Sequence, residues 1–177
     1  MQLKHILTGI SVMALALTSL AQQDKSKRPS PPGTAEVTLG GKKITIEYSR
    51  PFLKGRKAVG GELVPYGKVW RTGANEATSL TTEIDLNIGG ANVPAGKYTL
   101  YTLPAEDGWK LIISKQTGQW GTVYDEKQDL VRIDMKTTQL SAPVEQFTIL
   151  LEPVNPALAQ LSLEWENTQV SVPVRAW

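Results

Sequence analysis

The chain of 177 residues contains no cysteine and one histidine, His5. Without cysteine no disulfide can form, so the stability of the fold must come from packing. His5 lies in an N-terminal segment that we expect to be removed, so the mature chain lacks both residue types. This excludes Ser-His-Asp and Cys-His catalysis and ordinary zinc or copper sites. What remains is carboxylate, lysine, tyrosine and arginine chemistry, calcium or magnesium held by oxygens, or simple binding. Among these we expect no cofactor and no metal.

Only one long apolar run is present, from Ile6 to Leu20, and it is shorter than the roughly 20 residues that a membrane-spanning helix needs. It follows Lys4 and ends in small residues at Ala21, as signal peptides do. We predict a signal peptide over 1–21 and export to the periplasm or the medium, with no stable membrane insertion after its removal. A retained N-terminal anchor is the alternative.

A strong charge bias is also missing, since the formal net charge is +2. Removal of residues 1–21 takes away Lys4 and no acid, which leaves 18 Lys and Arg against 17 Asp and Glu. Nothing in this balance favours nucleic acid or an anionic membrane as the partner. The remaining 156 residues suffice for one domain with one core.

Amphipathic helical periodicity is almost absent, and short runs of Val, Ile, Thr and aromatic residues alternate with turn signals instead. The expected strands are 36–39, 43–48, 78–88, 97–103, 109–114, 130–135, 145–151, 161–165 and 169–174. We predict an all-β fold, a single antiparallel β-sandwich or jelly-roll-like domain of about nine to ten strands over 34–177. Residues 22–33 form an extended polar lead-in, and short helical turns are expected only at 75–77 and 155–160.

A basic segment runs from Arg50 to Arg71, with six Lys and Arg residues and the single acid Glu62. Its glycines and prolines indicate a loop that can shape a surface. Such a loop is suited to hold a carboxylate, sulfate or phosphate, because arginine forks and backbone N–H groups favour anions. The alternative is a long solvated connection.

The motif Tyr66–Thr78 gathers polar residues around Trp70. Trp70 beside Arg71 offers a stacking face next to a bidentate donor, although a tryptophan in a β protein often fills the core. Glu76 is expected to pair with Arg71 or Lys68, and Asn75 is a turn former. Trp120 and Arg132 are expected to line the same groove. The candidate ligand-binding residues are Arg50, Arg56, Tyr66, Lys68, Trp70, Arg71, Asn75, Glu76, Trp120 and Arg132.

Several ordered blocks resemble one family of secreted bacterial proteins, the domain of unknown function numbered twenty-nine eleven. The blocks are 46–51, 54–56, 64–78, 94–98, 119–121 and 129–132. The resemblance implies an exported, β-rich single domain and supplies no activity, substrate or catalytic residue. Ser114 departs mildly from the pattern, because asparagine is expected there.

We expect a non-enzymatic binding module for an unknown small molecule or glycan, anionic or carbohydrate in character. One alternative is a carboxylate-based, glycan-directed hydrolase, which needs two carboxyl groups about 5 to 9 Å apart in one cleft. Its candidate acids are Glu47, Glu76, Asp125, Glu126 and Asp129. Another alternative is a structural or assembly protein of the cell envelope, which predicts an exposed apolar patch.

Overall fold

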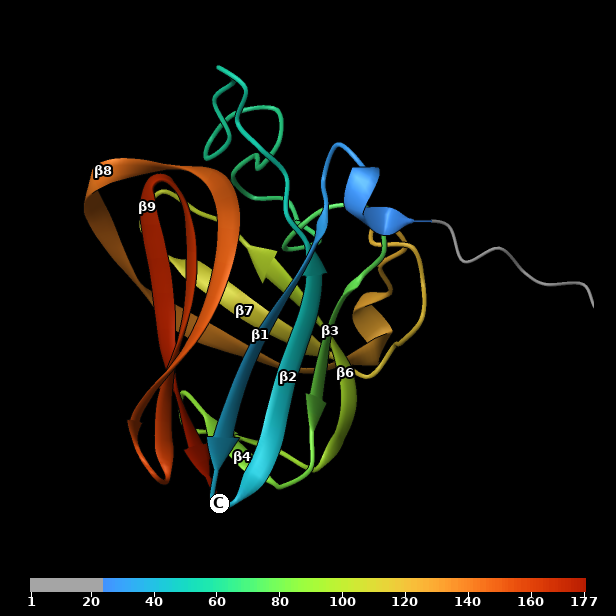
Figure 1. The fold of residues 1–177 in the computed structure, drawn as a ribbon, viewed down its shortest axis with the longest axis vertical. Helices are drawn as coiled ribbons and strands as arrows, with labels where there is room; N and C mark the ends of the chain where they lie inside the picture. Colours follow the sequence, from blue (N-terminus) through green and yellow to red (C-terminus); the bar gives the residue numbers. More distant parts are fainter. Residues whose placement is uncertain (1–23) are drawn as a thin grey trace, which may run out of the picture.

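The computed structural model describes residues 24–177 (Figure 1), so the predicted signal peptide over 1–21 lies outside the described residues. The elements are two 3-10 helices, η1 (Lys25–Lys27) and η2 (Glu126–Gln128), and nine strands, β1 (Pro32–Leu39), β2 (Lys42–Ser49), β3 (Thr78–Thr82), β4 (Leu86–Ile88), β5 (Ala91–Val93), β6 (Gly96–Leu103), β7 (Trp109–Ser114), β8 (Asp129–Asn155) and β9 (Leu158–Ala176). Among residues 24–177 no helix has the length and apolarity to cross a membrane.

The nine strands form one antiparallel sheet in the order β1-β2-β3-β6-β7-β8-β9-β4-β5. Strand β8 has 27 residues and belongs to two parts of this sheet. Its residues 129–135 pair with β7, and residues 136–155 pair with β9. The long strand therefore bends the sheet over, so that β8, β9 and β4 face β1, β2 and β3 across the core (Figure 1). The predicted all-β antiparallel class is confirmed.

Strand boundaries differ from the expected ones where pairing is irregular. The segments 130–135 and 145–151 are both parts of β8, and 161–165 and 169–174 are both parts of β9. Between Gln139 and Thr148, β8 advances nine positions while β9 covers only the four between Thr168 and Glu164. The extra residues of β8 form an arch over β9, and pairing resumes on its far side. Both strands are therefore continuous, and the turn signal near residue 167 does not end β9. The expected strand 78–88 divides instead into β3 and β4.

The two expected helical turns are wrong, because both segments satisfy their backbone groups by β pairing. Glu76 forms a bridge with Trp120, and Asn155 pairs with Leu158 at the end of the β8–β9 hairpin. The lead-in is not fully extended either: Asp24 caps η1 by accepting a bond from the Ser26 N–H at 3.1 Å.

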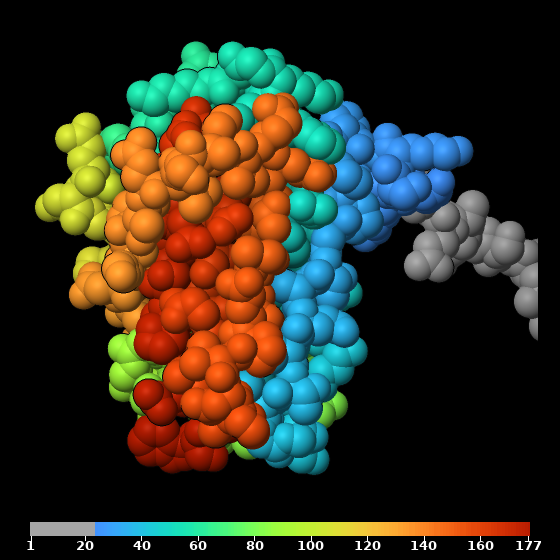
Figure 2. Space-filling view, turned by 60° about the vertical axis from the view of Figure 1, so that its left-hand side comes forward, coloured from blue at the N-terminus to red at the C-terminus, as the bar shows by residue number. Residues whose placement is uncertain are grey.

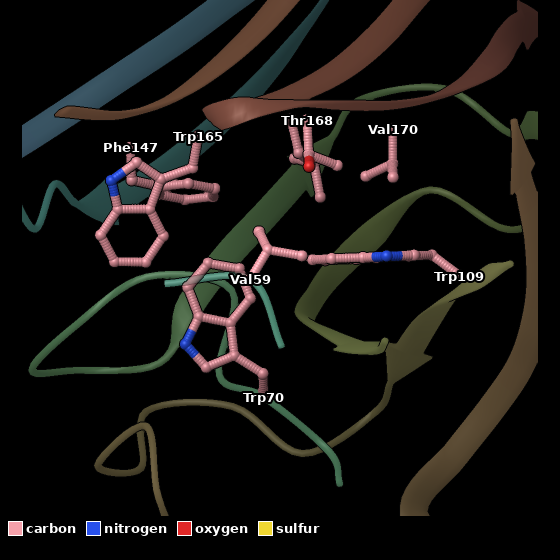
Figure 3. Close-up of a pocket in the computed structure, with 8 residues that line it drawn as sticks. Val59, Trp70, Trp109, Phe147, Trp165, Thr168 and Val170 are labelled. Atoms are coloured by element: carbon pink, nitrogen blue, oxygen red, sulfur yellow. The ribbon is translucent and has the colours of Figure 1, made fainter. Parts of the chain in front are cut away.

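Trp70 lies at the centre of an aromatic cluster between the two layers (Figure 3). Its ring stacks on Trp165 at 5.8 Å with an interplanar angle of 17°, and meets Phe147 edge-on at 5.0 Å and Trp109 at 6.5 Å. The cluster leaves a cavity of about 10 Å³, the least space that one water occupies. Trp70 is 8% exposed, so packing is its main role.

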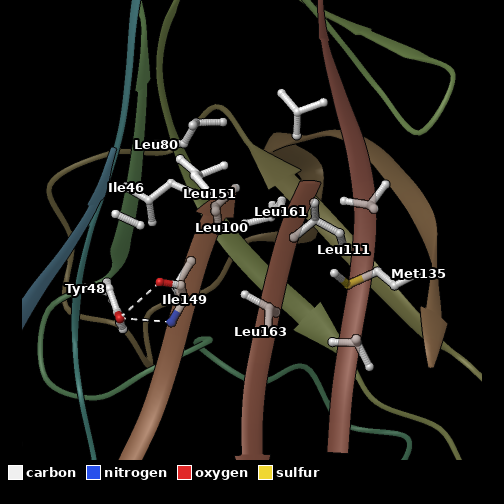
Figure 4. Close-up of a cluster of buried hydrophobic side chains, with 14 of the residues drawn as sticks. Ile46, Tyr48, Leu80, Leu100, Leu111, Met135, Ile149, Leu151, Leu161 and Leu163 are labelled. Carbon is white, nitrogen blue, oxygen red and sulfur yellow. Dashed lines mark hydrogen bonds between the residues drawn. The ribbon is translucent and has the colours of Figure 1, made fainter. Parts of the chain in front are cut away.

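The open edge of β8 is joined to the end of β2 by polar contacts. The Tyr48 hydroxyl accepts a hydrogen bond from the Ile149 N–H at 2.9 Å and donates to the Ile149 carbonyl at 3.4 Å (Figure 4). Arg50 donates to the Phe147 carbonyl at 3.2 Å and to the Thr148 hydroxyl at 2.9 Å. These bonds satisfy backbone groups that have no neighbouring strand, and they assign Arg50 to the scaffold.

We predict that Tyr48→Phe lowers the free energy of unfolding by about 1–3 kcal/mol, because it leaves the buried Ile149 N–H without an acceptor. Urea unfolding followed by tryptophan fluorescence measures this. Tyr66→Phe is the control, since the Tyr66 hydroxyl bonds to no described residue and its side chain is 39% exposed. Equal stability of Tyr48→Phe and the unmodified protein would show that Tyr48 does not hold this edge.

Candidate functional site

The motif Tyr66–Thr78 is a tight loop held by its own buried polar groups. Thr72 has a φ of 52° and is fully buried, and its carbonyl accepts a bond from the Thr78 hydroxyl at 2.8 Å. Gly73 has a φ of 152°, and a Cβ there would lie 2.9 Å from the Ser49 carbonyl oxygen. Only glycine fits such a position. The polar residues at the centre of the motif therefore shape its backbone.

Asn75 and Glu76 anchor the lead-in to the domain. The Asn75 amide donates to the Ser30 carbonyl at 3.1 Å. The Glu76 carboxylate accepts from Arg28 at 2.9 Å on both oxygens and pairs with Lys25 at 3.0 Å. The expected pairing of Glu76 with Arg71 or Lys68 is therefore wrong, because the chain before β1 supplies two nearer cations.

These contacts control the ionisation of Glu76. Partial burial raises the pKa of this carboxyl, but hydrogen bonds from Arg28, from its own backbone N–H and from Lys25 outweigh that effect and lower the pKa to about 2. Glu76 is thus ionised near neutral pH and is not a proton donor there. A cleft of about 290 Å³ does bring Glu47 and Glu76 together, and the Glu76 carboxylate in it is held by Arg28 and Lys25.

A short two-stranded ribbon separates Trp120 from Arg71. The Gly121 N–H donates to the Asn75 carbonyl at 3.0 Å, and Glu76 is paired with Trp120 in an antiparallel β-bridge between the two segments. Because neighbouring side chains in such a ribbon point to opposite faces, Trp120 lies on the Glu76 face and Gly121 on the other. A Cβ on Gly121 would lie 2.7 Å from Cδ of Arg71. Trp120, 50% exposed, does not line the Arg71 face.

Arg71 lies in a cleft of about 360 Å³, the Arg71 cleft. Its lining residues are Glu62, Leu63, Pro65, Lys68, Val69, Trp70, Arg71, Tyr101, Gly121, Thr122 and Tyr124. The half-buried Arg71 donates from Nε to the Gly73 carbonyl at 3.3 Å and forms no ion pair within residues 24–177. Burial lowers the pKa of its guanidinium. The cleft thus holds a partly desolvated cation without a carboxylate partner.

One wall of the cleft is a pair of tyrosines whose hydroxyls already have partners. Tyr101 donates to the Val123 carbonyl at 2.9 Å, and its ring lies 4.8 Å from that of Tyr124. Tyr124 donates to Asp129 at 2.7 Å and accepts from Arg132 at 2.9 Å. Burial, with the hydrogen bond and charge of Asp129, raises the pKa of Tyr124 to about 12. Both hydroxyls are therefore committed within the protein, and Tyr124 is the partly exposed ring of this wall, since Tyr101 is 1% exposed.

Arg132 supports this wall without lining the cleft, since it also pairs with Glu126 at 2.8 Å and Asp129 at 2.9 Å. Asp125 caps η2 by accepting from the Lys127 N–H at 3.0 Å. Within the part of the chain that the structure describes, no cluster of three or more acids is arranged to hold a metal ion.

Of the ten candidate residues, the structure brings Lys68, Trp70 and Arg71 into the Arg71 cleft. Arg56 donates to the Leu53 and Phe52 carbonyls, at 3.0 and 2.9 Å. The Tyr66 ring covers Gly60, where a Cβ would meet it at 2.7 Å. The seven candidates outside the cleft lining are Arg50, Arg56, Tyr66, Asn75, Glu76, Trp120 and Arg132.

Sequence analysis did not place Glu62, Tyr101 or Thr122 in a site. One signal for Tyr101 was present, because Tyr98–Thr102 contains no charged residue, and in the structure β6 is buried on both faces over this run. A strand without a polar face must be covered on both sides, here by the core and by the loop that carries Tyr124.

Comparison with known proteins shows one family. The model of the family described as Protein of unknown function (DUF2911) matches residues 30–174. Neither the curated proteins nor the solved structures contain a match to the chain.

We predict that Glu76→Gln flattens the acid side of the stability curve. The pKa of Glu76 is lowered from 4.5 to about 2 on folding, so its contribution is present above pH 4.5 and is lost as the pH falls toward 2. The difference in unfolding free energy between the unmodified protein and Glu76→Gln should therefore shrink over this range, in urea titrations at each pH. The effect is reduced by solvent, because the side chain is 41% exposed.

Glu106→Gln is the matched control, since Glu106 is exposed and pairs with no cation among the described residues. A pH-independent difference for Glu76→Gln would contradict the assigned pairing with Arg28 and Lys25.

Proposed function

The chain belongs to the DUF2911 family of proteins of unknown function, and we propose that it is an exported, non-enzymatic binding protein that holds an acidic small molecule, such as a sugar acid, in the Arg71 cleft. The observation that carries this proposal is the half-buried Arg71 guanidinium, which has no carboxylate partner within residues 24–177.

A cation that is partly removed from water favours an anionic partner, because solvation no longer stabilises its charge fully. The guanidinium fork binds a carboxylate through two parallel hydrogen bonds, and Arg71 commits only Nε to the protein. Lys68 adds a second cation to the lining, and Glu62 is its single acid. The balance of charge in the cleft therefore favours a ligand with one negative group.

The rest of the cleft suits a small ring with apolar and polar faces. Its volume of about 360 Å³ lies within the range of roughly 300–1,000 Å³ that small-molecule sites occupy. Leu63, Pro65 and the partly exposed Tyr124 ring supply apolar surface, and Thr122 supplies a hydroxyl. A sugar acid presents such faces beside a carboxylate. The Arg71 cleft carries the proposal because its cation has no carboxylate partner, whereas Glu76 in the cleft shared with Glu47 is already paired with Arg28 and Lys25.

Export is testable by itself. When the full chain is produced in a Gram-negative host, we expect the protein in the periplasm or medium with Gln22 as its first residue, by intact-mass analysis. Ala21→Arg, which places a large charged residue at the cleavage position, should leave the signal attached. Recovery of the uncleaved, unmodified chain in the cytoplasm would contradict export.

Ligand capture is tested with galacturonate as the acidic probe and glucose as the neutral one, in NMR titrations of labelled residues 22–177. We expect galacturonate to bind and to shift resonances of Arg71 and Thr122, while glucose does not. Arg71→Gln should weaken binding roughly 10- to 100-fold, because it removes a charge-assisted hydrogen bond of about 1.5–3 kcal/mol.

Arg175→Gln removes the same charge from an exposed position of β9 beside β4 and is the matched control. Equal loss of affinity in Arg71→Gln and Arg175→Gln would indicate general charge attraction and overturn the assigned cleft. NMR resonance shifts confined to residues outside the cleft on addition of galacturonate would also overturn the assigned cleft.

A further inference from the structure

A second basic cleft adjoins the Arg71 cleft. It has a volume of about 360 Å³ and is lined by Arg56, Lys57, Gly61, Glu62 and Leu63, and we name it the Lys57 cleft. Glu62 and Leu63 line both clefts and form the ridge between them. In Figure 2 the segment after β2 that carries this ridge, in teal, lies across one end of the molecule beside β8 and β9.

The loop that builds the ridge has a defined fold. The Val64 N–H donates to the Ala58 carbonyl at 3.1 Å, and the Gly60 N–H donates to the Val64 carbonyl at 2.9 Å. Glu166 of β9 accepts from the Val59 N–H at 2.6 Å. Ala58 and Val64 are fully buried. A loop tied down in this way holds its two clefts in a fixed relation, which a merely solvated connection does not require.

The cations of the Lys57 cleft remain available to a ligand. Lys57 is exposed and forms no ion pair within residues 24–177. The Arg56 guanidinium is oriented by its bonds to the Leu53 and Phe52 carbonyls, and its Nη1 bonds to no described residue. Two adjoining clefts thus each present a pair of cations, Arg56 with Lys57 and Lys68 with Arg71, on either side of one acid.

We infer that the ligand is an oligomer of sugar acids that lies across the Glu62–Leu63 ridge, with one carboxylate in each cleft. This inference rests on the proposed function of the Arg71 cleft. The chain of such an oligomer carries hydroxyl groups between its carboxylates, and Glu62 accepts hydrogen bonds from hydroxyls. Leu63 contacts the apolar face of the unit that crosses the ridge.

Glu62 also distinguishes this ligand from a continuous polyanion. A polyphosphate has adjacent charged groups with no ring hydroxyls between them, so a charged group would lie above Glu62 and be repelled, whereas a sugar-acid chain can present hydroxyls there. The alternation of cation pair, acid and cation pair matches a chain whose charges are spaced apart. Lys57 and Arg56 are therefore specificity residues for ligand length.

The experiment compares mono-, di- and trigalacturonate by isothermal titration calorimetry at one low ionic strength, with tripolyphosphate as the dense polyanion. We expect trigalacturonate to bind the unmodified protein about tenfold or more tightly than the monomer, because the second contact becomes intramolecular. Lys57→Gln should remove most of this gain with length, and the charge reversal Lys57→Glu should remove all of it. Lys97→Gln, an exposed lysine of β6, is the matched control.

Each outcome separates the two proposals. If monomer and trimer bind equally, or if Lys57→Gln and Lys97→Gln act alike, the extended ligand is wrong while the Arg71 cleft stands. If no galacturonate of any length binds, the proposed function fails as well. Tripolyphosphate binding as tightly as trigalacturonate would overturn the sugar-acid class. Unchanged amide spectra of the variants establish that they are folded.

Discussion

The burial of Trp70 between the two layers is the constraint on which the rest of the structure depends. Its backbone pairs with Thr102 through two hydrogen bonds of 2.8 and 3.0 Å, while its ring stacks on Trp165. With Trp70 directed into the core, its neighbour Arg71 faces the other way, because successive side chains of an extended segment alternate. The same packing that stabilises the sandwich therefore places a guanidinium in the outer cleft.

The polar residues of the Trp70 motif divide into two groups with different tasks. Thr72 bonds to the Thr102 hydroxyl inside the domain, and Asn75 and Glu76 attach the lead-in through Ser30, Arg28 and Lys25. Arg71 and Lys68 retain charge that the described residues do not neutralise. Only the second group is free to recognise a ligand, and the folded backbone that carries it lowers the ordering cost of binding.

Features that depend on residues close together in the sequence could be predicted, and features that depend on pairing between distant segments could not. The alternation of Ile44, Ile46 and Tyr48 identified β2, because a strand with one buried face leaves a local, two-residue period. The arch of β8 left no such signal, since its irregular register depends on β9 and on contacts near Arg50. Short-range patterns thus predicted the strands, and long-range pairing decided where they join.

By itself the sequence determined the all-β class, the family, the absence of cysteine chemistry and the concentration of positive charge from Arg50 to Arg71. These follow from composition and local periodicity, which need no partner segment. Only the tertiary structure decided which charges are free. Glu76 meets Arg28 across 48 positions of the chain, Arg50 meets Thr148 across 98, and Arg71 forms no ion pair among the described residues. Charge pairing depends on distance in space, which the order of residues does not contain.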